Sequence, residues 1–319
     1  MKTNKISISE LSLFIESQNI SITSISLYKE SQTSIDYIVN FDYLVRLSEK
    51  PLPEEKILTI LANYSSTPHI LLSGYFNINS YNTYITIMDY IKGNELYQMI
   101  QNLDESEQFN VGNHLGHYLQ QLHNIKDSYY DIGHYIPVIP RYKGSWKSGH
   151  IKYTDWIKEN LFQFKYEDNI KAFLEKAIQY VYDHIDALDF QTGPVLLHND
   201  LHPKNIIINQ NHLSGIIDWE CAQFGERDFE LTHLFHWSEY PMEDGHNFPL
   251  LIKQVIKSYQ AIYIIPNLDQ RLTIYQIQHE LFQMILHSGN VTKLRLQRIQ
   301  GWLDGNISKL INSFQLAKI

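Results

Sequence analysis

The chain has 319 residues, of which 44% are hydrophobic and 19% are charged, and its mean hydropathy is −0.29. These values are typical of a folded globular protein and exclude an intrinsically disordered chain. The 35 acidic residues outnumber the 26 basic ones, and the resulting net charge of −9 argues against a nucleic-acid-binding protein.

A single cysteine, Cys221, excludes an internal disulfide framework and a zinc site built from cysteines. No run reaches the roughly 18 consecutive apolar residues that a membrane span requires. The first residues also lack the apolar core and the cleavage site of a secretory signal. We therefore expect a cytoplasmic protein with no membrane partner.

Strand signals dominate the beginning of the chain. Residues 21–30, 34–48 and 69–91 carry many β-branched and aromatic side chains. Between them, residues 53–66 predict one short helix, because a proline opens the segment and two glutamates follow it. The N-terminal part is thus expected to be β-rich.

Helical patterns replace the strand signals after residue 90. Apolar residues recur at helical spacing in 111–122 and again in 272–290. We predict two lobes, a β-rich lobe at 1–90 with one helix and a mainly helical lobe at 91–319. Residues 195–218 form an island of short strands within the helical lobe.

This island carries polar side chains at strand ends. Its sequence is VLLHNDLHPKNIIIN, followed by a turn and then GIIDWE. Asp200 and Asn205 lie in one polar loop between two apolar runs, and Asp218 ends the strand that follows. Asn205 and Asp218 form the sparse oxygen set that Mg²⁺ accepts when phosphate and water oxygens complete its coordination. Asp200 is placed to take a proton from a substrate hydroxyl.

The stretches LHNDLHPKNIII and GIIDWECAQFG resemble the aminoglycoside phosphotransferase family, whose members have a protein-kinase-like fold. The first stretch is similar to the kinase catalytic loop H-R-D-x-x-x-x-N, and IIDWE stands in the place of D-F-G. The resemblance runs from about residue 20 to about residue 235. It implies an α+β fold of two lobes, with a small antiparallel β-sheet lobe and a larger, mainly helical lobe.

The resemblance also implies a reaction, the Mg²⁺-dependent transfer of the γ-phosphoryl group of ATP or GTP to a hydroxyl group. Asp200 is then the catalytic base or orienting carboxylate, Asn205 and Asp218 hold Mg²⁺, and His198 supports the loop. His202 replaces a common kinase lysine, so it serves either in charge stabilisation or in loop support. Helical sequence follows DWECAQFG almost directly, which favours a small acceptor over a protein.

Residues upstream of the island supply the nucleotide site that the resemblance implies. Arg46 stands where a lysine usually pairs with phosphate, and Glu54 is its expected partner, with Glu55 as the alternative. Adenine is expected to meet the backbone of Asp89 and Ile91. From the residues alone, Arg46 is also compatible with a surface strand charge, and Glu54 is equally compatible with a plain helix-start carboxylate.

Two further positions follow from the resemblance. KESQTSIDY stands where a glycine-rich phosphate loop belongs but contains no glycine, so Ser31 and Ser34 are expected to bind phosphate instead. Downstream, Glu230 replaces the family's customary aspartate and is expected to support the catalytic loop. His233 and His236 lie among apolar residues, which predicts packed core histidines.

The acceptor is expected to be an amine-bearing compound such as an aminoglycoside, which would connect the enzyme with antibiotic resistance. This expectation rests on aromatic and acidic residues that suit a cationic ligand, namely Trp237, Glu239, Tyr240, Glu243 and Asp244. An ordinary exposed loop is the plainer interpretation of this segment. Choline, methylthioribose, homoserine and amino sugars are the competing acceptors.

Two other functions stay open at this point. His198, Asp200 and His202 form H-x-D-x-H, a pattern that also suits a metallohydrolase with zinc or manganese. The altered phosphate loop is compatible with a non-catalytic, nucleotide-binding pseudokinase. The presence of Asp200, Asn205 and Asp218 together argues against that second alternative.

Overall fold

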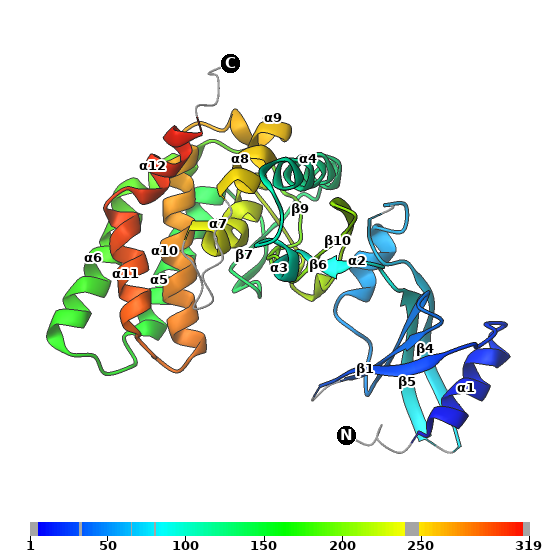
Figure 1. Cartoon of the computed structure of the whole chain (residues 1–319). Helices are drawn as coiled ribbons and strands as arrows, with labels where there is room; N and C mark the ends of the chain where they lie inside the picture. The colour runs from blue at the N-terminus through cyan, green and yellow to red at the C-terminus, as the bar shows by residue number, and fades with distance from the viewer. Residues whose placement is uncertain (1–5, 32–33, 65, 80, 240–248, 315–319) are drawn as a thin grey trace. The chain divides into compact units, whose positions relative to one another are not determined.

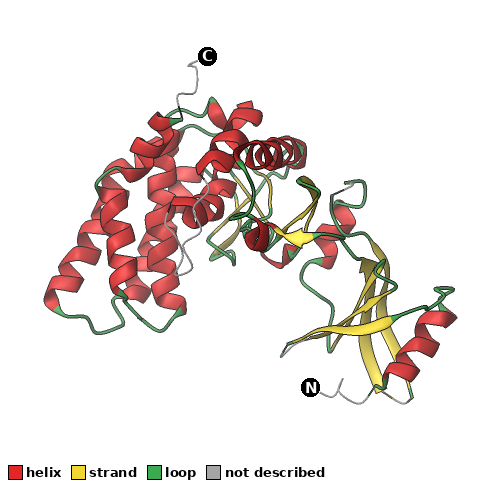
Figure 2. Ribbon diagram, viewed as in Figure 1, coloured by secondary structure: helices red, strands yellow, loops and turns green. Residues whose placement is uncertain are grey.

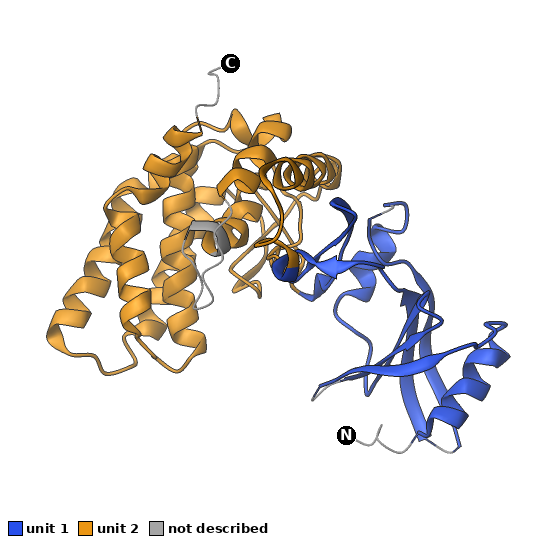
Figure 3. Ribbon diagram, in the orientation of Figure 1, with its two compact units in different colours: residues 1–98, 204–220 blue, residues 99–203, 221–319 orange. Residues whose placement is uncertain are grey.

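The structure is a computed structural model that describes residues 6–31, 34–64, 66–79, 81–239 and 249–314. It consists of two compact units, which Figure 3 shows in different colours. The first unit comprises Met1–Gln98 and Lys204–Glu220, and the second comprises Met99–Pro203 and Cys221–Ile319. The segment that contains Asn205 and Asp218 therefore packs with the N-terminal part of the chain.

A five-stranded antiparallel sheet forms the body of the first unit (Figure 2). The strand order is β1-β2-β3-β5-β4. The strands are β1 (Ile25–Glu30), β2 (Ser34–Val39), β3 (Tyr43–Ser48), β4 (Ile70–Ile78) and β5 (Tyr81–Asp89). Five of the six residues of β2 are buried, because this strand lies inside the sheet.

Two helices accompany this sheet, whereas the sequence predicts one. Helix α2 (Glu55–Ile60) lies in the expected segment, and helix α1 (Ile8–Ser17) precedes the sheet. The Ile and Ser residues of α1 have low helix propensity, but a capping box between Ser7 and Glu10 starts the helix. Leu11 of α1 is buried in the same apolar core as residues of β2, β3 and β5.

The predicted hairpin of the island belongs to a second, three-stranded sheet of the first unit. Its order is β11-β10-β6, with β6 (Asn94–Glu95), β10 (Ile206–Asn209) and β11 (His212–Ile216). Burial of Ile206, Ile207 and Ile208 explains the apolar run in the sequence.

Helices make up most of the second unit (Figure 1). They are α4 (Glu105–Leu122), α5 (Trp146–Leu161), α6 (Asp168–His184), α7 (Leu231–Glu239), α8 (Pro249–Ser258), α9 (Gln260–Tyr263), α10 (Leu268–Leu286), α11 (Lys293–Leu303) and α12 (Asn306–Ser313), and α3 (Leu96–Met99) crosses the boundary between the units. Two small sheets pair β7 (Tyr130–Ile132) with β8 (Ile139–Tyr142) and β9 (Val195–Leu197) with β12 (Gln223–Gly225). Short 3-10 helices lie at Ile185–Asp189, Trp219–Cys221 and Arg227–Glu230. None of the helices in the described ranges is long and apolar enough to cross a membrane.

Helix α10 lies at the centre of the second unit and packs against α5, α6, α7, α11 and α12. Most of its polar residues are buried, so they need hydrogen-bond or charge partners. Arg271 donates to both carboxylate oxygens of Asp228, at 2.6 and 3.0 Å, and to the carbonyl oxygens of Ala187 and Phe190. This ion pair joins α10 to the segment that leads into α7.

Helices α4 and α8 approach each other through two glycines of α4. A Cβ atom on Gly112 would lie 2.6 Å from the carbonyl oxygen of Leu251, and one on Gly116 would lie 2.7 Å from that of Val255. These distances are too short for contact between a Cβ atom and a main-chain carbonyl oxygen. Glycine spacing of four residues therefore sets how closely the two helices pack.

We expect Gly116→Ala to lower the free energy of unfolding by about 1–3 kcal/mol, because the new methyl group overpacks against α8. This sign is opposite to the ordinary effect, in which alanine stabilises a helix by about 1 kcal/mol relative to glycine. Urea denaturation measures the change. Gln120, exposed on the same helix, supplies the control, where the alanine variant should be more stable than the glycine variant. If alanine made the protein more stable than glycine at both positions, the packing role of Gly116 would be contradicted.

Candidate active site

Left-handed backbone conformations occur in the turn of the island, at Gln210 and Asn211, and at two residues outside that turn. Asn199 has a φ of 60° and Asp218 a φ of 66°. Residues other than glycine adopt this region at a cost of roughly 1 kcal/mol or more, and such positions concentrate at functional sites. Both belong to the motifs that resemble the kinase catalytic loop and D-F-G.

The register of the hairpin brings Asn205 and Asp218 next to each other. Ile206 pairs with Ile216, and the N–H of Ile217 donates to the carbonyl oxygen of Asn205 at 3.0 Å. Asp218 is the next residue along that strand end. The proposed metal ligands thus leave neighbouring strands of one sheet, with Asn205 buried and Asp218 exposed.

Arg46 is held by two carboxylates in the first unit, and one of them is the predicted partner Glu54. Its Nη1 donates to Glu54 Oε1 at 2.9 Å. Its Nε and Nη2 donate to Asp36 at 2.8 and 2.9 Å. Asp36 is directly opposite Arg46 in the β2–β3 register, a role that the sequence does not predict. A single charge inside the strand SIDYIV is the only local signal, and it does not identify a cross-strand partner.

The choice between Glu54 and Glu55 is settled by their hydrogen bonds. Glu55 accepts hydrogen bonds from the hydroxyl groups of Tyr84 and Thr86. Glu54 instead joins Arg46 to the main chain of Trp219, whose N–H donates to Glu54 Oε2 at 3.2 Å. The ion pair is therefore coupled to the segment that carries Asp218.

Burial raises the pKa of Glu54 to about 7, against the lowering effect of Arg46. The nearby carboxylate of Asp218 raises this pKa further. Glu54 is only 5% exposed, so its charge is poorly screened by water. Its ionised state consequently depends on the cation beside it.

In the second unit, the polar loop after β9 carries Asp200 and His202. His202 Nε2 lies 3.6 Å from one carboxylate oxygen of Asp200, and His233 Nδ1 lies 3.6 Å from the other. The N–H of Asp200 donates to His198 Nδ1 at 3.3 Å. His198 therefore holds the loop, as the resemblance implies, and this contact disfavours its use as a metallohydrolase ligand.

Glu230 supports the same loop, which confirms the expectation for this position. Its Oε2 accepts the N–H of His198 at 2.7 Å, and its Oε1 accepts the N–H of Asn199 at 3.1 Å. His123 Nε2 lies 3.6 Å from Oε2. A fully buried carboxylate thus satisfies two main-chain donors of the turn before Asp200.

The other predicted nucleotide residues lie in the first unit. Ser31 and Ser34 bond to each other, with Ser34 N donating to Ser31 Oγ at 3.0 Å and Ser31 N to Ser34 O at 2.9 Å. Asp89 pairs with His69 through its side chain at 2.8 Å, and its N–H donates to the carbonyl of His69. Only the carbonyl oxygen of Asp89 is then suited to a nucleotide. Phosphate binding by the serines and adenine binding by Asp89 and Ile91 remain predictions.

The predicted acceptor segment is only partly described. Trp237 and Glu239 lie in helix α7, whereas Tyr240, Glu243 and Asp244 lie outside the described residues. The position of α7 next to the loop of Asp200 is described through His233. The acceptor assignment stays a prediction.

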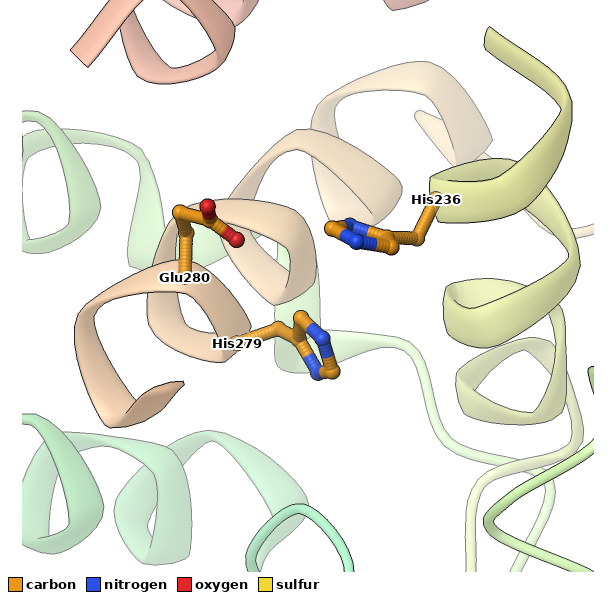
Figure 4. A group of neighbouring side chains, drawn as sticks. All are labelled: His236, His279 and Glu280. Carbon is orange, nitrogen blue, oxygen red and sulfur yellow. The ribbon is translucent and has the colours of Figure 1, made fainter. Parts of the chain in front are cut away.

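Within the described part of the chain, one group of side chains is arranged like a metal site (Figure 4). His236 points from α7 toward His279 and Glu280 of α10, and the candidate ligand atoms lie within 4.8 Å of one another. However, Arg298 and Arg295 contact Glu280 Oε1 at 3.3 and 3.4 Å.

These two arginines argue against a cation at the group. A dication on Glu280 would lie within roughly 7 Å of each guanidinium, and each repulsion would be about 5 kcal/mol at an effective dielectric constant of about 20. We therefore assign the arginines, rather than a metal ion, as the charge partners of Glu280.

A sequence model described as the phosphotransferase enzyme family matches residues 27–261. The chain belongs to this family. It is therefore an enzyme, a phosphotransferase that acts on hydroxyl groups, as the resemblance implies. The match includes Arg46, Glu54 and the whole island that carries Asp200. No curated protein matches the chain in sequence.

Solved structures of aminoglycoside phosphotransferases share the fold of this family member. The GDP complex of wild-type aminoglycoside 2'-phosphotransferase-IIIa has a TM-score of 0.63 and 15% identity, over 94% of this chain and 98% of that one. The streptomycin–ATP complex of APH(2")-IIa has a TM-score of 0.60 and 19% identity, over 96% of each chain. For APH(4)-Ia the values are 0.62 and 17%, over 95% and 99%. The predicted fold class, with an antiparallel β-sheet in the N-terminal part and a mainly helical C-terminal part, is confirmed.

We expect Glu230→Gln to lower the free energy of unfolding by about 1–3 kcal/mol, because one main-chain N–H of the loop then faces an amide N–H₂ group. Urea denaturation followed by tryptophan fluorescence measures the loss. Glu159→Gln, at an exposed position, is the matched control and should change stability by less than about 0.5 kcal/mol. Equal stability of the two variants would show that Glu230 does not support the loop.

Glu54 should make the protein less stable as the pH rises. Its folded-state pKa of about 7 lies above the ordinary value of 4.5, so the unfolded chain releases this proton first. The stabilising difference is complete below pH 4.5 and is lost as the pH rises to about 7, at a cost of up to about 3 kcal/mol. Glu54→Gln should remove this component, and Glu55→Gln is the control. Parallel pH profiles of the free energy of unfolding for wild type and Glu54→Gln would contradict the assignment.

Proposed function

We propose that the chain is a Mg²⁺-dependent small-molecule kinase that transfers the γ-phosphoryl group of ATP or GTP to a hydroxyl group. One observation carries this proposal, the combination of two sets of residues in the first unit. Asn205 and Asp218 leave neighbouring strands at one sheet end. The main-chain N–H of Trp219 donates to Glu54 and so links this segment to the Arg46–Glu54 pair. Family membership and neighbours solved with GDP or ATP support a nucleotide donor.

Asn205 and Asp218 fit Mg²⁺ because both offer hard oxygen atoms and leave adjacent strands at one sheet end. When bound, Mg²⁺ would offset the charge of the nucleotide phosphates. Arg46 directs three of its five N–H groups to Asp36 and Glu54, and its other donors would bind phosphate. The carboxylates around Arg46 fix the guanidinium for that contact.

Asp200 acts on the acceptor in this proposal. Its carboxylate takes the proton of the acceptor hydroxyl as that oxygen bonds to the γ-phosphorus and the bond to the β-phosphate oxygen breaks, which releases ADP or GDP. His202, 3.6 Å from the carboxylate, stabilises charge or supports the loop. Positioning supplies most of the rate enhancement, because phosphoryl transfer needs little covalent chemistry from the protein.

We further propose the division of labour that the sequence predicts. The β-rich lobe at 1–90 carries the nucleotide residues Ser31, Ser34 and Asp89, and Ile91 follows directly after it. The helical lobe at 91–319 carries Asp200 and the acceptor residues of the 237–244 segment.

The acceptor is proposed to be an aminoglycoside-type or other amine-bearing compound. Neighbouring structures contain streptomycin, gentamicin, kanamycin or hygromycin B, and the acidic and aromatic segment at 237–244 suits a cation. Choline, methylthioribose, homoserine and amino sugars are the alternatives. A coupled ADP- and GDP-release screen over these compounds identifies the acceptor. Nucleotide binding without turnover across the whole panel would favour a pseudokinase instead.

We expect Asp200→Asn to reduce kcat by on the order of 10² or more, because the amide cannot accept the hydroxyl proton. Nucleotide affinity should stay within a few-fold of wild type, since Asp200 does not bind the donor. Steady-state kinetics and calorimetric nucleotide titration measure the two quantities. Full activity of the variant would remove Asp200 from the mechanism.

Asp218→Ala should abolish the Mg²⁺-dependent part of nucleotide binding, because one of two protein ligands of the ion is lost. Titration of nucleotide with and without Mg²⁺ measures this part. Glu220→Gln, an exposed carboxylate two residues away, is the matched control and should retain it. Unchanged Mg²⁺-dependent binding in Asp218→Ala would falsify the metal assignment.

A further inference from the structure

The carboxylate of Asp200 lies between two histidines that differ in their surroundings. His202 Nε2 is 3.6 Å from Oδ2, and its side chain is 18% exposed. His233 Nδ1 is 3.6 Å from Oδ1, and its side chain is 1% exposed. The resemblance to known kinases points to His202, whereas nothing in the motifs assigns a role to His233.

Packing fixes the ring of His233 at this position. The ring of Tyr135 meets it edge to face at a centroid distance of 4.9 Å, and the ring of His279 does so at 5.0 Å. The main chain of Asn199 also faces the imidazole, just before Asp200. Both neighbouring groups of the loop, a main chain and a carboxylate, can accept a hydrogen bond from the ring.

His233 follows Glu230 by three residues, so the two side chains lie about one helical turn apart and contact the loop at two points. Glu230 accepts the N–H groups of His198 and Asn199, and His233 lies against the side chain of Asp200. The first contact fixes the main chain of the loop. The second fixes the side chain that the main chain carries.

Burial lowers the pKa of His233 well below its usual value, and His279 and His202 lower it further. The imidazole is therefore neutral near pH 7 and can donate one N–H. A separation of 3.6 Å is longer than a formed hydrogen bond, but such contacts often tighten only when the substrates are bound. A neutral donor holds a carboxylate without cancelling its charge.

We propose that His233 is a positioning residue, whose Nδ1–H is donated to Oδ1 of Asp200 and thereby directs Oδ2 toward the acceptor hydroxyl. This inference rests on the proposed function of Asp200. It assigns one oxygen of the carboxylate to the protein and the other to the substrate. It also requires the Nδ1–H tautomer of His233, because Nδ1 is the nitrogen that lies 3.6 Å from Asp200 Oδ1.

The test compares His233→Asn with His233→Leu. These side chains have nearly the same shape and leave similar space, but only asparagine places an N–H donor where Nδ1 lies. We expect kcat of the asparagine variant to stay within about threefold of wild type and that of the leucine variant to fall by about tenfold or more, because misplacing a catalytic group by 1 Å can cost as much as 10². KM for the nucleotide should not change in either variant.

His236 supplies the matched control, since it is one turn further along α7 and is likewise buried. Its asparagine and leucine variants should have equal kcat values, because no side chain at this position needs to hold Asp200. Equal kcat values for the two His233 variants, whether both high or both low, would overturn the positioning role.

A second measurement does not depend on turnover. Long-range ¹H–¹⁵N spectra of the full chain with ¹⁵N-labelled histidine, assigned by the loss of one signal in His233→Asn, report which ring nitrogen carries the proton. We expect the neutral Nδ1–H form at pH 7.5. The Nε2–H form would overturn the inference even in an active enzyme. If instead no acceptor is turned over by the wild type, the proposed function fails, and the tautomer still decides whether His233 donates to Asp200.

Discussion

Two hydrogen bonds to the buried carboxylate of Glu230 are the interaction on which the candidate site depends. The polar loop after β9 turns sharply, with Asn199 in a left-handed conformation, and its N–H groups cannot pair within a strand. A buried main-chain donor without a partner would cost about 1–3 kcal/mol. Glu230 removes that cost and holds the turn in the one shape that presents Asp200.

The same physical solution recurs in the first unit, where buried carboxylates hold a cation. Arg46 would be costly to bury alone, and Asp36 and Glu54 compensate for its charge. Because Glu54 also accepts the N–H of Trp219, the ion pair and the segment after Asp218 are fixed together. The proposed phosphate ligand Arg46 is therefore held in place by two carboxylates.

Histidines also help to hold the loop that carries Asp200. His123, His198 and His233 all contact the loop of Asp200 or its support, Glu230. Burial lowers the pKa of His123 and His233, so these rings act as neutral donors and acceptors near pH 7. Neutral polar groups suit this place, because they orient a carboxylate and leave its charge for the reaction.

Patterns that depend on short spacings were predictable from the sequence. The polar residues between apolar runs at 195–218 predicted the hairpin. The ion pair of Arg46 with Glu54 was expected from a known motif. The helix at Ile8–Ser17 is not predicted, because Ile and Ser have weak helix preference, although a capping box of Ser7 and Glu10 starts it. Asp36 was missed because a single charge inside an apolar strand gives no hint of its cross-strand partner.

The sequence by itself determined the family and the class of reaction and predicted the oxygen-bearing residues of the candidate site, since these depend on residue type and on spacing along the chain. Only the tertiary structure decided which carboxylate faces Arg46, what holds the loop of Asp200, and that two arginines occupy the carboxylate of Glu280. Contacts of this kind join residues far apart in sequence. They follow from strand register and helix packing, which no local pattern encodes.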